Sequence, residues 1–375
     1  MKITAVRTTP LRIPYALSYH MTQGARTEAS MVLVEVETDD GLTGIGESMA
    51  RPDAAFVENA LADAAEAVIG QDPFAVDALM AEVHRRFMAI PSADMDRMAR
   101  LAVAGLDMAL WDLAGKAAGR PVHALLGGAV HDHVQYFAFI EGETPDVMAE
   151  DARRYLAEGI EVFYVKLGRG DDEDVACAAA IRDAIGDKRL RLDANEAWDM
   201  MGAIHMIKRL EPFDPEFIEQ PVSSHSMDAL RQVKEAVQVP IAADQAIHSP
   251  ADVYAYCRAR AADVIVLGVH EAGGLGQMRK AAAVADAAGI RICLHGVPES
   301  GITTTASHHL ALSLPNIDDG NQIMCRFLAE DLISAPDLTL VDGRLPVFDG
   351  PGLGLTLDRD AIGRAAARAA AAKGN

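Results

Sequence analysis

The strongest constraint on the fold is a repeated alternation of short apolar runs with helical segments, which begins near residue 134. Seven runs resemble buried strands and a weaker eighth lies near Ile317; the seven cover 134–140, 162–167, 190–194, 217–220, 239–244, 264–267 and 290–294. Helical periodicity occupies the intervals 146–158, 172–185, 199–209, 227–236, 250–260, 275–288 and 301–313. This repeat favours an α/β fold, a (β/α) barrel of the modified TIM-barrel kind, over a doubly wound open sheet, which periodicity alone does not exclude.

The residues on either side of the repeat predict a second unit of α+β type. Residues 31–37 alternate like a strand, Asp39-Asp40-Gly41 supply a turn, and 42–47 return as a second strand. Helical patterns follow over 52–70, 73–88 and 97–118, and an Ala-rich helix ends the chain. We therefore expect a capping domain over 1–128, the barrel over 129–325, and a segment over 326–375 that returns to the cap.

The charge balance limits the kinds of partner. The chain has 55 acidic and 34 basic residues and a formal net charge of −21, which opposes binding to nucleic acid or to anionic lipid. It has no apolar stretch of the roughly 18 residues that a membrane helix needs, and no signal-peptide pattern at its start. We expect a cytoplasmic homo-oligomer that captures a small anionic substrate through local positive charge.

Four ionisable residues end four consecutive runs of the repeat. They are Lys166, Asp193, Glu219 and Asp244, and their spacings of 27, 26 and 25 residues each equal one barrel unit. In such a barrel the strand ends meet at one rim, where active sites form. Three carboxylates without a cation would repel one another, and oxygen ligands suit Mg²⁺, or Mn²⁺, better than Zn²⁺. A single acid is commonly a helix cap or an ion-pair partner, but the matched triple indicates a metal site.

Two further residues are candidate acid/base groups. Lys166 would extend to solvent on an ordinary surface, but beside a dication in a pocket its neutral amine is favoured, as a general base requires. His295 ends the seventh run and faces Lys166 across the predicted barrel, where it is either a second acid/base or a core or loop residue. Glu299, four residues later, would orient His295 or contact substrate.

Several motifs extend this pattern over nearly the whole chain. They are LDMALWDL at 106–113, LLGG at 125–128, Gly273-Gly274, and GPGLG at 350–354. Together with the three carboxylates they resemble the enolase superfamily, specifically its mandelate racemase and muconate lactonizing enzyme branch. The resemblance implies that Asp193, Glu219 and Asp244 bind Mg²⁺, that Lys166 is the base on one face of the substrate, and that His295 is the acid/base on the other face.

Two positions depart from the pattern of that family. Many relatives carry Lys-x-Lys on the second strand, whereas this chain has Tyr164 before Lys166, and the tyrosine would bond substrate or a metal-bound carboxylate. The sixth strand ends at Gly268, where relatives have a lysine or an aspartate. A two-lysine mechanism is therefore disfavoured, and His270 or Glu271 is left to orient His295.

The resemblance also implies substrate contacts. In this family the loop between the first strands folds over the barrel mouth, so His20 and Arg26 are candidates, with Asn195 beside the metal ligands. The predicted reaction is Mg²⁺-dependent removal of the α-proton of a carboxylate, with dehydration of a sugar acid or hydroxy acid favoured over cycloisomerisation and racemisation. A non-catalytic binding protein on the same scaffold and a Schiff-base aldolase using Lys166 are the rivals, and the carboxylate triple argues against both.

Overall fold

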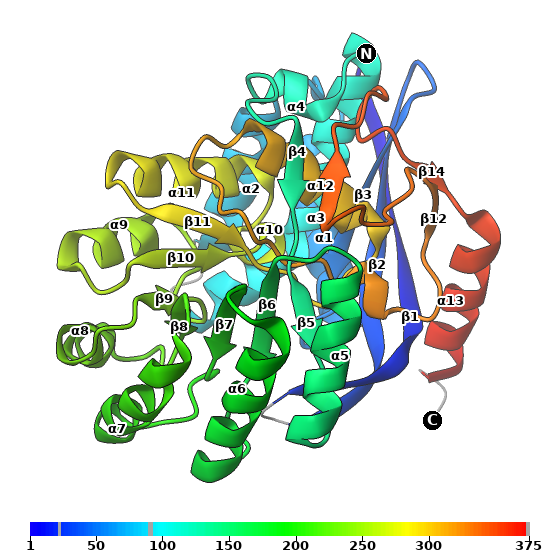
Figure 1. The fold of residues 1–375 in the computed structure, drawn as a ribbon. Helices are drawn as coiled ribbons and strands as arrows, with labels where there is room; N and C mark the ends of the chain where they lie inside the picture. Colours follow the sequence, from blue (N-terminus) through cyan, green and yellow to red (C-terminus); the bar gives the residue numbers. More distant parts are fainter. Residues whose placement is uncertain (22–23, 89–92, 373–375) are drawn as a thin grey trace.

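A curled sheet of seven parallel strands forms the centre of the molecule, in the order β11-β10-β9-β8-β7-β6-β5 (Figure 1). The computed structural model describes residues 1–21, 24–88 and 93–372. The strands are β5 (Ala138–Ile140), β6 (Val162–Lys166), β7 (Arg189–Asp193), β8 (Phe217–Glu219), β9 (Ile241–Ala243), β10 (Val264–Leu267) and β11 (Arg291–Leu294). The helices that follow them are α5 (Pro145–Ala157), α6 (Asp171–Ile185), α7 (Met200–Leu210), α8 (Met227–Ala236), α9 (Pro250–Ala259), α10 (Val269–Ala272), α11 (Leu275–Ala287) and α12 (Gly301–Ser313).

The barrel closes differently from the predicted eight-strand pattern. In the described part of the chain, the segment near Ile317 forms isolated parallel bridges, Ile292–Ile317 and Tyr136–Asn321, in place of an eighth strand. The predicted strand at 134–140 is split, because the amide of Tyr136 donates to the carbonyl of Gly343 at 2.8 Å. Its first part, β4 (His133–Gln135), pairs with β13 (Arg344–Pro346), and only β5 joins the central sheet.

The N-terminal strands and the last helix form a layer beside the barrel, as the sequence predicts. The antiparallel strands are β1 (Ile3–Met21), β2 (Gly24–Thr38) and β3 (Thr43–Met49). The helices are α1 (Ala54–Val68), α2 (Val76–Met88), α3 (Ala93–Ala118), α4 (Val122–Leu125) and α13 (Arg359–Ala372), and a small sheet joins β12 (Ile333–Ala335) to β14 (Thr356–Leu357). The C-terminal α13 lies along β1 (Figure 1), where Arg368 donates to the carbonyl of Arg12 at 2.9 Å.

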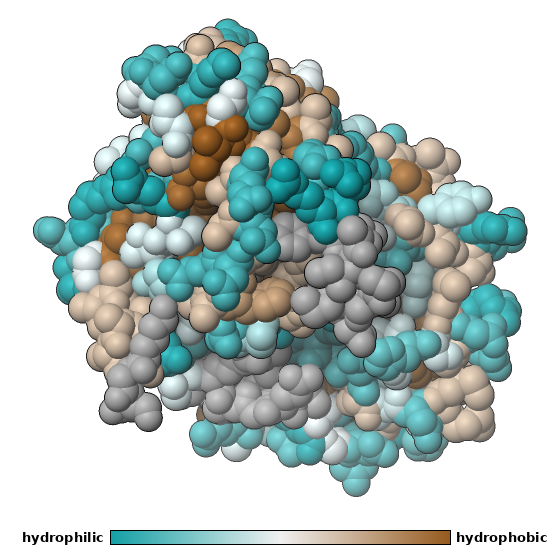
Figure 2. All heavy atoms as spheres, turned by 180° about the vertical axis from the view of Figure 1, so that it is seen from behind, coloured by the Kyte–Doolittle hydropathy of each residue, from teal (hydrophilic) through white to brown (hydrophobic). Residues whose placement is uncertain are grey.

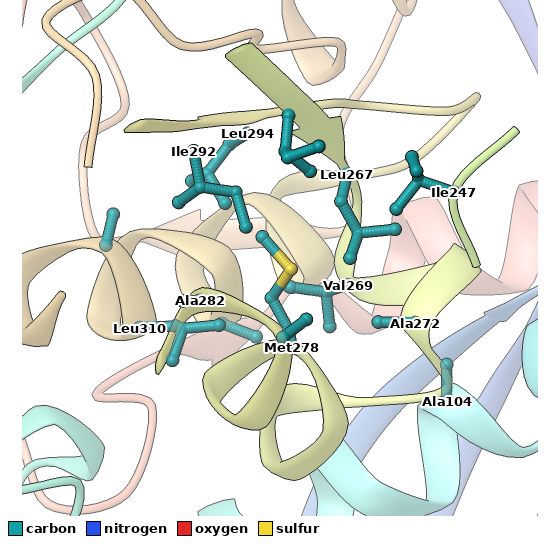
Figure 3. Packing of buried hydrophobic residues seen from close by; sticks show 14 of the residues in the cluster. Ala104, Ile247, Leu267, Val269, Ala272, Met278, Ala282, Ile292, Leu294 and Leu310 are labelled. Carbon is teal, nitrogen blue, oxygen red and sulfur yellow. The ribbon is translucent and has the colours of Figure 1, made fainter. Parts of the chain in front are cut away.

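Apolar side chains of the strands and the surrounding helices make the core. Figure 3 shows Leu267, Ile292 and Leu294 of the sheet gathered with Met278 of α11 and Leu310 of α12. Each of these side chains is at most 2% exposed, so the strand ends rest on a closely packed base. Polar residues cover much of the face drawn in Figure 2. No helix among the described residues has the length and hydropathy needed to cross a bilayer.

A buried aspartate of the cap joins it to the barrel. Asp107 of α3 accepts hydrogen bonds from the amides of Leu275, at 2.5 Å, and Gly276, at 3.4 Å, at the start of α11. Gly274 has a φ of +119°, and a Cβ atom there would lie 2.3 Å from Asp107, so glycine is required. The amides of this glycine-rich turn therefore bind the carboxylate of Asp107, and this contact helps to hold the cap against the barrel.

Candidate active site

Four charged side chains lie at the carboxyl ends of adjacent strands. Lys166 ends β6 and is paired in register with Asp193 of β7, which is in turn paired with Glu219 of β8. Asp244 follows the end of β9 directly. The three carboxylates are at most 2% exposed and Lys166 is 9% exposed. The strand register thus brings all four groups to one buried edge of the sheet.

Tyr164 connects two of these carboxylates. Its hydroxyl oxygen lies 2.6 Å from Oδ2 of Asp193 and 2.9 Å from Oε1 of Glu219, so its single proton is shared between two carboxylates. The ring stacks on Phe137 with 4.6 Å between ring centroids, and the residue is 2% exposed. Lys166 donates from Nζ to the same oxygen of Asp193. Tyr164 therefore holds the acidic residues in place and is not among the residues that line the cavity described below.

The acidic groups are destabilised as anions unless a cation is added. Burial, together with the charges of Asp193 and Asp244, raises the pKa of Glu219 well above its ordinary value. Burial and the nearby Glu271 raise the pKa of Asp244 to about 6, although His295 opposes this. Both carboxylate oxygens of Asp244 are buried and accept no hydrogen bond from the described residues. Buried polar atoms normally have partners, so this carboxylate is suited to a cation.

His295 is held by a carboxylate from the neighbouring strand unit. Its Nδ1 lies 2.7 Å from Oε2 of Glu271 and 3.5 Å from Oδ1 of Asp244. Burial disfavours the charged imidazole, but Asp244 and Glu271 outweigh it and raise the pKa of His295 to about 10. Burial likewise opposes the charge on Glu271, yet His295 and Arg97 hold the pKa of Glu271 well below its ordinary range. The two groups form an ion pair at neutral pH.

The backbone explains why Glu271, rather than the residue at the end of β10, meets His295. A Cβ atom on Gly268 would lie 2.8 Å from the carbonyl oxygen of His295, so a side chain does not fit there without a shift. Glu271 comes three residues later on α10, and its Oε2 also accepts from the amide of Gly268 at 3.3 Å. His270 points elsewhere and lies 3.0 Å from the hydroxyl of Thr303. Of the two residues suggested by the sequence, Glu271 is the one in contact.

Two overlapping sets of residues are candidate metal ligands, and in one of them the ligand atoms are shown to lie close together. Atoms of Asp244, Glu271 and His295 lie within 4.8 Å of one another. Asp193, Glu219 and Asp244, the ligands that the sequence predicts, lie at the ends of three consecutive strands, and the hydroxyl of Tyr164 lies between Asp193 and Glu219. An all-oxygen set of this kind suits a divalent cation such as Mg²⁺.

A cavity of about 210 Å³ is lined by Lys166, Glu271 and His295, whereas Asp193, Glu219 and Asp244 are not among its lining residues. Its charged and amide side chains are Arg51, Arg97, Lys166, Asn195, Glu196, Gln245, Glu271 and His295, and much of its apolar wall is Met49, Met98, Leu101, Val297 and Met324. Drug-sized ligands occupy pockets of about 300–1,000 Å³, so this cavity suits a small molecule. Lys166 and His295 both line it; they come from β6 and from the end of β11, and the four strands β7 to β10 lie between these two.

Some of the predicted site residues do not line the cavity, and the cavity also contains residues that the sequence did not predict. Glu299 is buried and is not among the cavity residues; burial and Glu47 raise its pKa well above the ordinary value. The side chains of His20 and Arg26 lie outside the described residues. Arg51 and Arg97 line the cavity but were not predicted. Both belong to the cap, where the strand–helix repeat of the barrel gives no indication of which residues reach the cavity.

Comparison with known proteins identifies the class. A barrel with carboxylates on successive strand ends beneath an α+β cap is the architecture of the enolase enzymes. Residues 147–361 match the family described as enolase C-terminal domain-like, and residues 2–127 match the mandelate racemase/muconate lactonizing enzyme N-terminal domain. The chain belongs to the enolase superfamily, in its mandelate racemase and muconate lactonizing enzyme branch, and is an enzyme.

The relatives carry out several reactions on this scaffold. Muconate cycloisomerase 1 of Rhodococcus opacus is 32% identical over 96% of this chain and 98% of its own length. D-galactonate dehydratase of Xanthomonas oryzae pv. oryzae is 28% identical over 89% of this chain and 90% of its own. Among solved structures, a dipeptide epimerase from Enterococcus faecalis with Mg and L-Leu-L-Tyr superposes with a TM-score of 0.87, at 28% identity, over 95% of this chain and 100% of its own.

Proposed function

We propose that this enzyme removes the α-proton of a small carboxylate substrate, with Lys166 as the base and His295 as the acid/base on the opposite face. The order of the strands carries the proposal: β6 bears Lys166, β7 and β8 bear the first two carboxylates, and β11 leads to His295. A substrate whose carboxylate lies over the acidic residues would thus have Lys166 on one side and His295 on the other.

We further propose that Asp193, Glu219 and Asp244 bind Mg²⁺. Two observations support this: the buried oxygens of Asp244 accept no hydrogen bond from the described residues, and the pKa of Glu219 is raised. A divalent cation at this position would stabilise the negative charge that develops on the substrate carboxylate. Tyr164 orients two of the three ligands through its shared hydrogen bonds.

Dehydration of a sugar acid or hydroxy acid is the favoured reaction. Lys166 takes the α-proton, and His295, whose pKa is raised by Asp244 and Glu271, gives a proton to the departing hydroxyl group. Asn195 and Gln245 line the same cavity and provide amide groups for the other hydroxyls. D-galactonate dehydratases among the relatives support this choice.

Cycloisomerisation is the second candidate, because two relatives of similar identity are named for it. They are muconate cycloisomerase 1 of Rhodococcus opacus, at 32%, and D-galactarolactone cycloisomerase of Agrobacterium fabrum, at 31%. The same His295 would then exchange a proton with a ring oxygen or with a carbon. Epimerisation of dipeptides is disfavoured, since Gly268 supplies no second base and Glu271 occupies the space beside His295.

The test is a screen of acid sugars, hydroxy acids and amino-acid derivatives in D₂O with Mg²⁺, read by proton NMR. We expect α-deuteration of at least one hydroxy acid, followed by loss of water. The Lys166→Ala variant, assayed with the same acid, is the matched control. Deuteration that persists at the wild-type rate in this variant would contradict the proposal, as would full activity in metal-free enzyme.

A further inference from the structure

A buried glutamate of the cap reaches the barrel near the loop that follows His295. Glu47 lies on β3, and the alternation of that strand turns Gly44 and Gly46 toward α3, where a Cβ atom on either would lie within 2.0 Å of a backbone oxygen. Glu47 faces the other way, toward the barrel, and is 0% exposed. It is not among the residues that line the cavity. The cap thus places a carboxylate between the two units, outside the space for substrate.

This carboxylate holds the start of α12. Oε1 of Glu47 accepts from the amide of Ser300 at 3.0 Å, and Oε2 accepts from the hydroxyl of the same residue. Ser300 is the N-cap of α12, and its hydroxyl oxygen also accepts from the amide of Ile302 at 3.2 Å. A carboxylate is favoured at a helix N-terminus, where amides lack partners within the helix. Only residues 296–299 separate Ser300 from His295, so Glu47 fixes the far end of the loop that begins at His295.

Thr303 links Glu47 to His270. The hydroxyl of Thr303, in the first turn of α12, donates to Oε1 of Glu47 at 3.0 Å, and its oxygen lies 3.0 Å from Nε2 of His270. Oε1 of Glu47 is an acceptor, because it also receives the amide proton of Ser300. The single hydroxyl proton of Thr303 is therefore used, and Nε2 of His270 must be the donor. Glu47, Thr303 and His270 are each at most 1% exposed, so a broken link leaves a buried polar group without a partner.

The short helix α10 depends on contacts of this kind for its position. It is a single turn, and so short a helix is not stable through its own hydrogen bonds. The cap residue Arg100 donates to the carbonyl of Ala272 at 3.3 Å and anchors the end of the turn. Thr303 anchors its beginning through the ring of His270. The hydrogen-bonded chain from Glu47 therefore contributes to fixing the place of α10.

We propose that Glu47 and Thr303 are positioning residues for the proton transfer of His295. They hold α10 through His270, so that Glu271, the next residue on the same turn, keeps its 2.7 Å contact with Nδ1 of His295. This inference rests on the proposed function, which makes His295 the acid/base. Neither Glu47 nor Thr303 lines the cavity, so their effect on the reaction is transmitted through other residues.

The test measures net turnover and α-proton exchange together, in D₂O with Mg²⁺ and the acid found in the screen. Thr303→Val has nearly the same shape but no hydroxyl. We expect its turnover to fall by about 10-fold or more, since a small misplacement of a catalytic group costs up to about 10²-fold. Exchange should stay within about 2-fold, because the base Lys166 is carried by β6, which the chain from Glu47 does not contact. The ratio of exchange to turnover should therefore rise.

Three further variants separate positioning from general destabilisation. Thr303→Ser keeps the hydroxyl and should restore the wild-type ratio, whereas Glu47→Ala should raise the ratio as Thr303→Val does. Asp112→Asn is the matched control. Asp112 is also a buried carboxylate of the cap, and it accepts from the amides of Ile45 at 2.8 Å and Leu353 at 2.7 Å, away from α10. This variant should be less stable to urea without any change in the ratio.

Crystal structures give a readout that needs no substrate. In Thr303→Val the distance between Nδ1 of His295 and Oε2 of Glu271 should exceed about 3.5 Å, the limit of a hydrogen bond. If this variant does not fold, Glu47→Ala takes its place in both measurements. An unchanged contact, or equal losses of exchange and turnover, would overturn the positioning role.

The outcomes also separate this proposal from the proposed function. If the wild type exchanges the α-proton of an acid and Thr303→Val keeps the wild-type ratio, the positioning role is wrong and the function stands. If the wild type exchanges no acid, the proposed function fails. The crystal structure of the variant then decides by itself whether Thr303 holds Glu271 against His295.

Discussion

Oε2 of Glu271 lies 2.7 Å from Nδ1 of His295 and joins the start of α10 to the end of β11. This contact fixes which ring nitrogen of His295 faces the cavity, because Nδ1 is engaged and Nε2 is left for substrate. Glu271 thus supplies the orienting carboxylate that the end of β10 cannot, since Gly268 has no room for a side chain there.

We predict that Glu271→Gln lowers kcat by about 10²-fold with little change in KM, because the amide neither charges nor orients His295 as the carboxylate does. Glu271→Asp should recover part of the loss. Steady-state kinetics on the substrate found in the D₂O screen would measure this. A parallel loss of thermal stability in both variants, with KM raised as much as kcat falls, would instead assign Glu271 a structural role.

Metal binding can be tested both by activity and, without any substrate, by direct titration. EDTA should abolish activity and Mg²⁺ should restore it. Glu219→Gln should weaken Mg²⁺ binding by about 10-fold or more, because a neutral amide replaces a charged ligand. Titration calorimetry with Mg²⁺ measures the affinity directly. Glu235→Gln, an exposed position on α8, is the matched control and should bind Mg²⁺ as the wild type does.

Tyr164 should influence the same measurement without contacting the metal. Its hydroxyl holds Asp193 and Glu219 together, and outer residues of this kind typically change metal affinity by about 10- to 100-fold. We therefore expect Tyr164→Phe to weaken Mg²⁺ binding by about 10-fold, whereas Tyr254→Phe, at an exposed position, should have no effect. Unchanged affinity in Tyr164→Phe would mean that the carboxylates are positioned by the strands alone.

The strand ends were predictable because barrel units repeat at a nearly constant length, which places Lys166, Asp193 and Glu219 in register. The limits of the first and last strands of the barrel could not be predicted. The segment near Ile317 is apolar enough for a strand, but it forms only isolated bridges. Arg51 and Arg97 could not be assigned, since their position depends on how the cap packs against the barrel, through contacts such as Asp107 with the amides of α11.

Buried histidines on α12 predict a pH dependence of stability. His308 lies 2.9 Å from the hydroxyl of Tyr136 and 2.8 Å from the carbonyl of Pro346, and burial lowers its pKa to about 4 from an ordinary 6.5. The folded state therefore binds fewer protons than the unfolded state between these values. The stability that neutral His308 contributes is present above pH 6.5 and is lost as the pH falls toward 4, by about 1.4 kcal/mol per pH unit.

Replacement of this histidine should flatten that dependence. We expect His308→Gln to be less stable than the wild type at pH 7 but to lose less stability between pH 7 and pH 5, as measured by urea unfolding. The free energy of unfolding of the wild type is compared with that of His308→Gln at each pH, so that contributions common to both proteins cancel. These include the buried Glu47 and Asp107, whose raised pKa values make stability increase as the pH falls. His205→Gln, on the exposed face of α7, should follow the wild-type curve, and identical slopes for His308→Gln would contradict the prediction.

The last prediction concerns the separate proton-transfer roles of Lys166 and His295. If the two residues flank the substrate, removal of one should leave the proton transfer of the other intact. Lys166→Ala should lose α-proton exchange by at least about 10²-fold, the lower end of general acid–base contributions. His295→Asn should retain exchange at the face of Lys166 while net turnover falls by a similar factor, because the deprotonated substrate forms but cannot lose its hydroxyl. Deuterium incorporation by His295→Asn is the decisive measurement. If exchange disappears together with turnover, His295 is the first base or a structural residue, and the proposed roles are wrong.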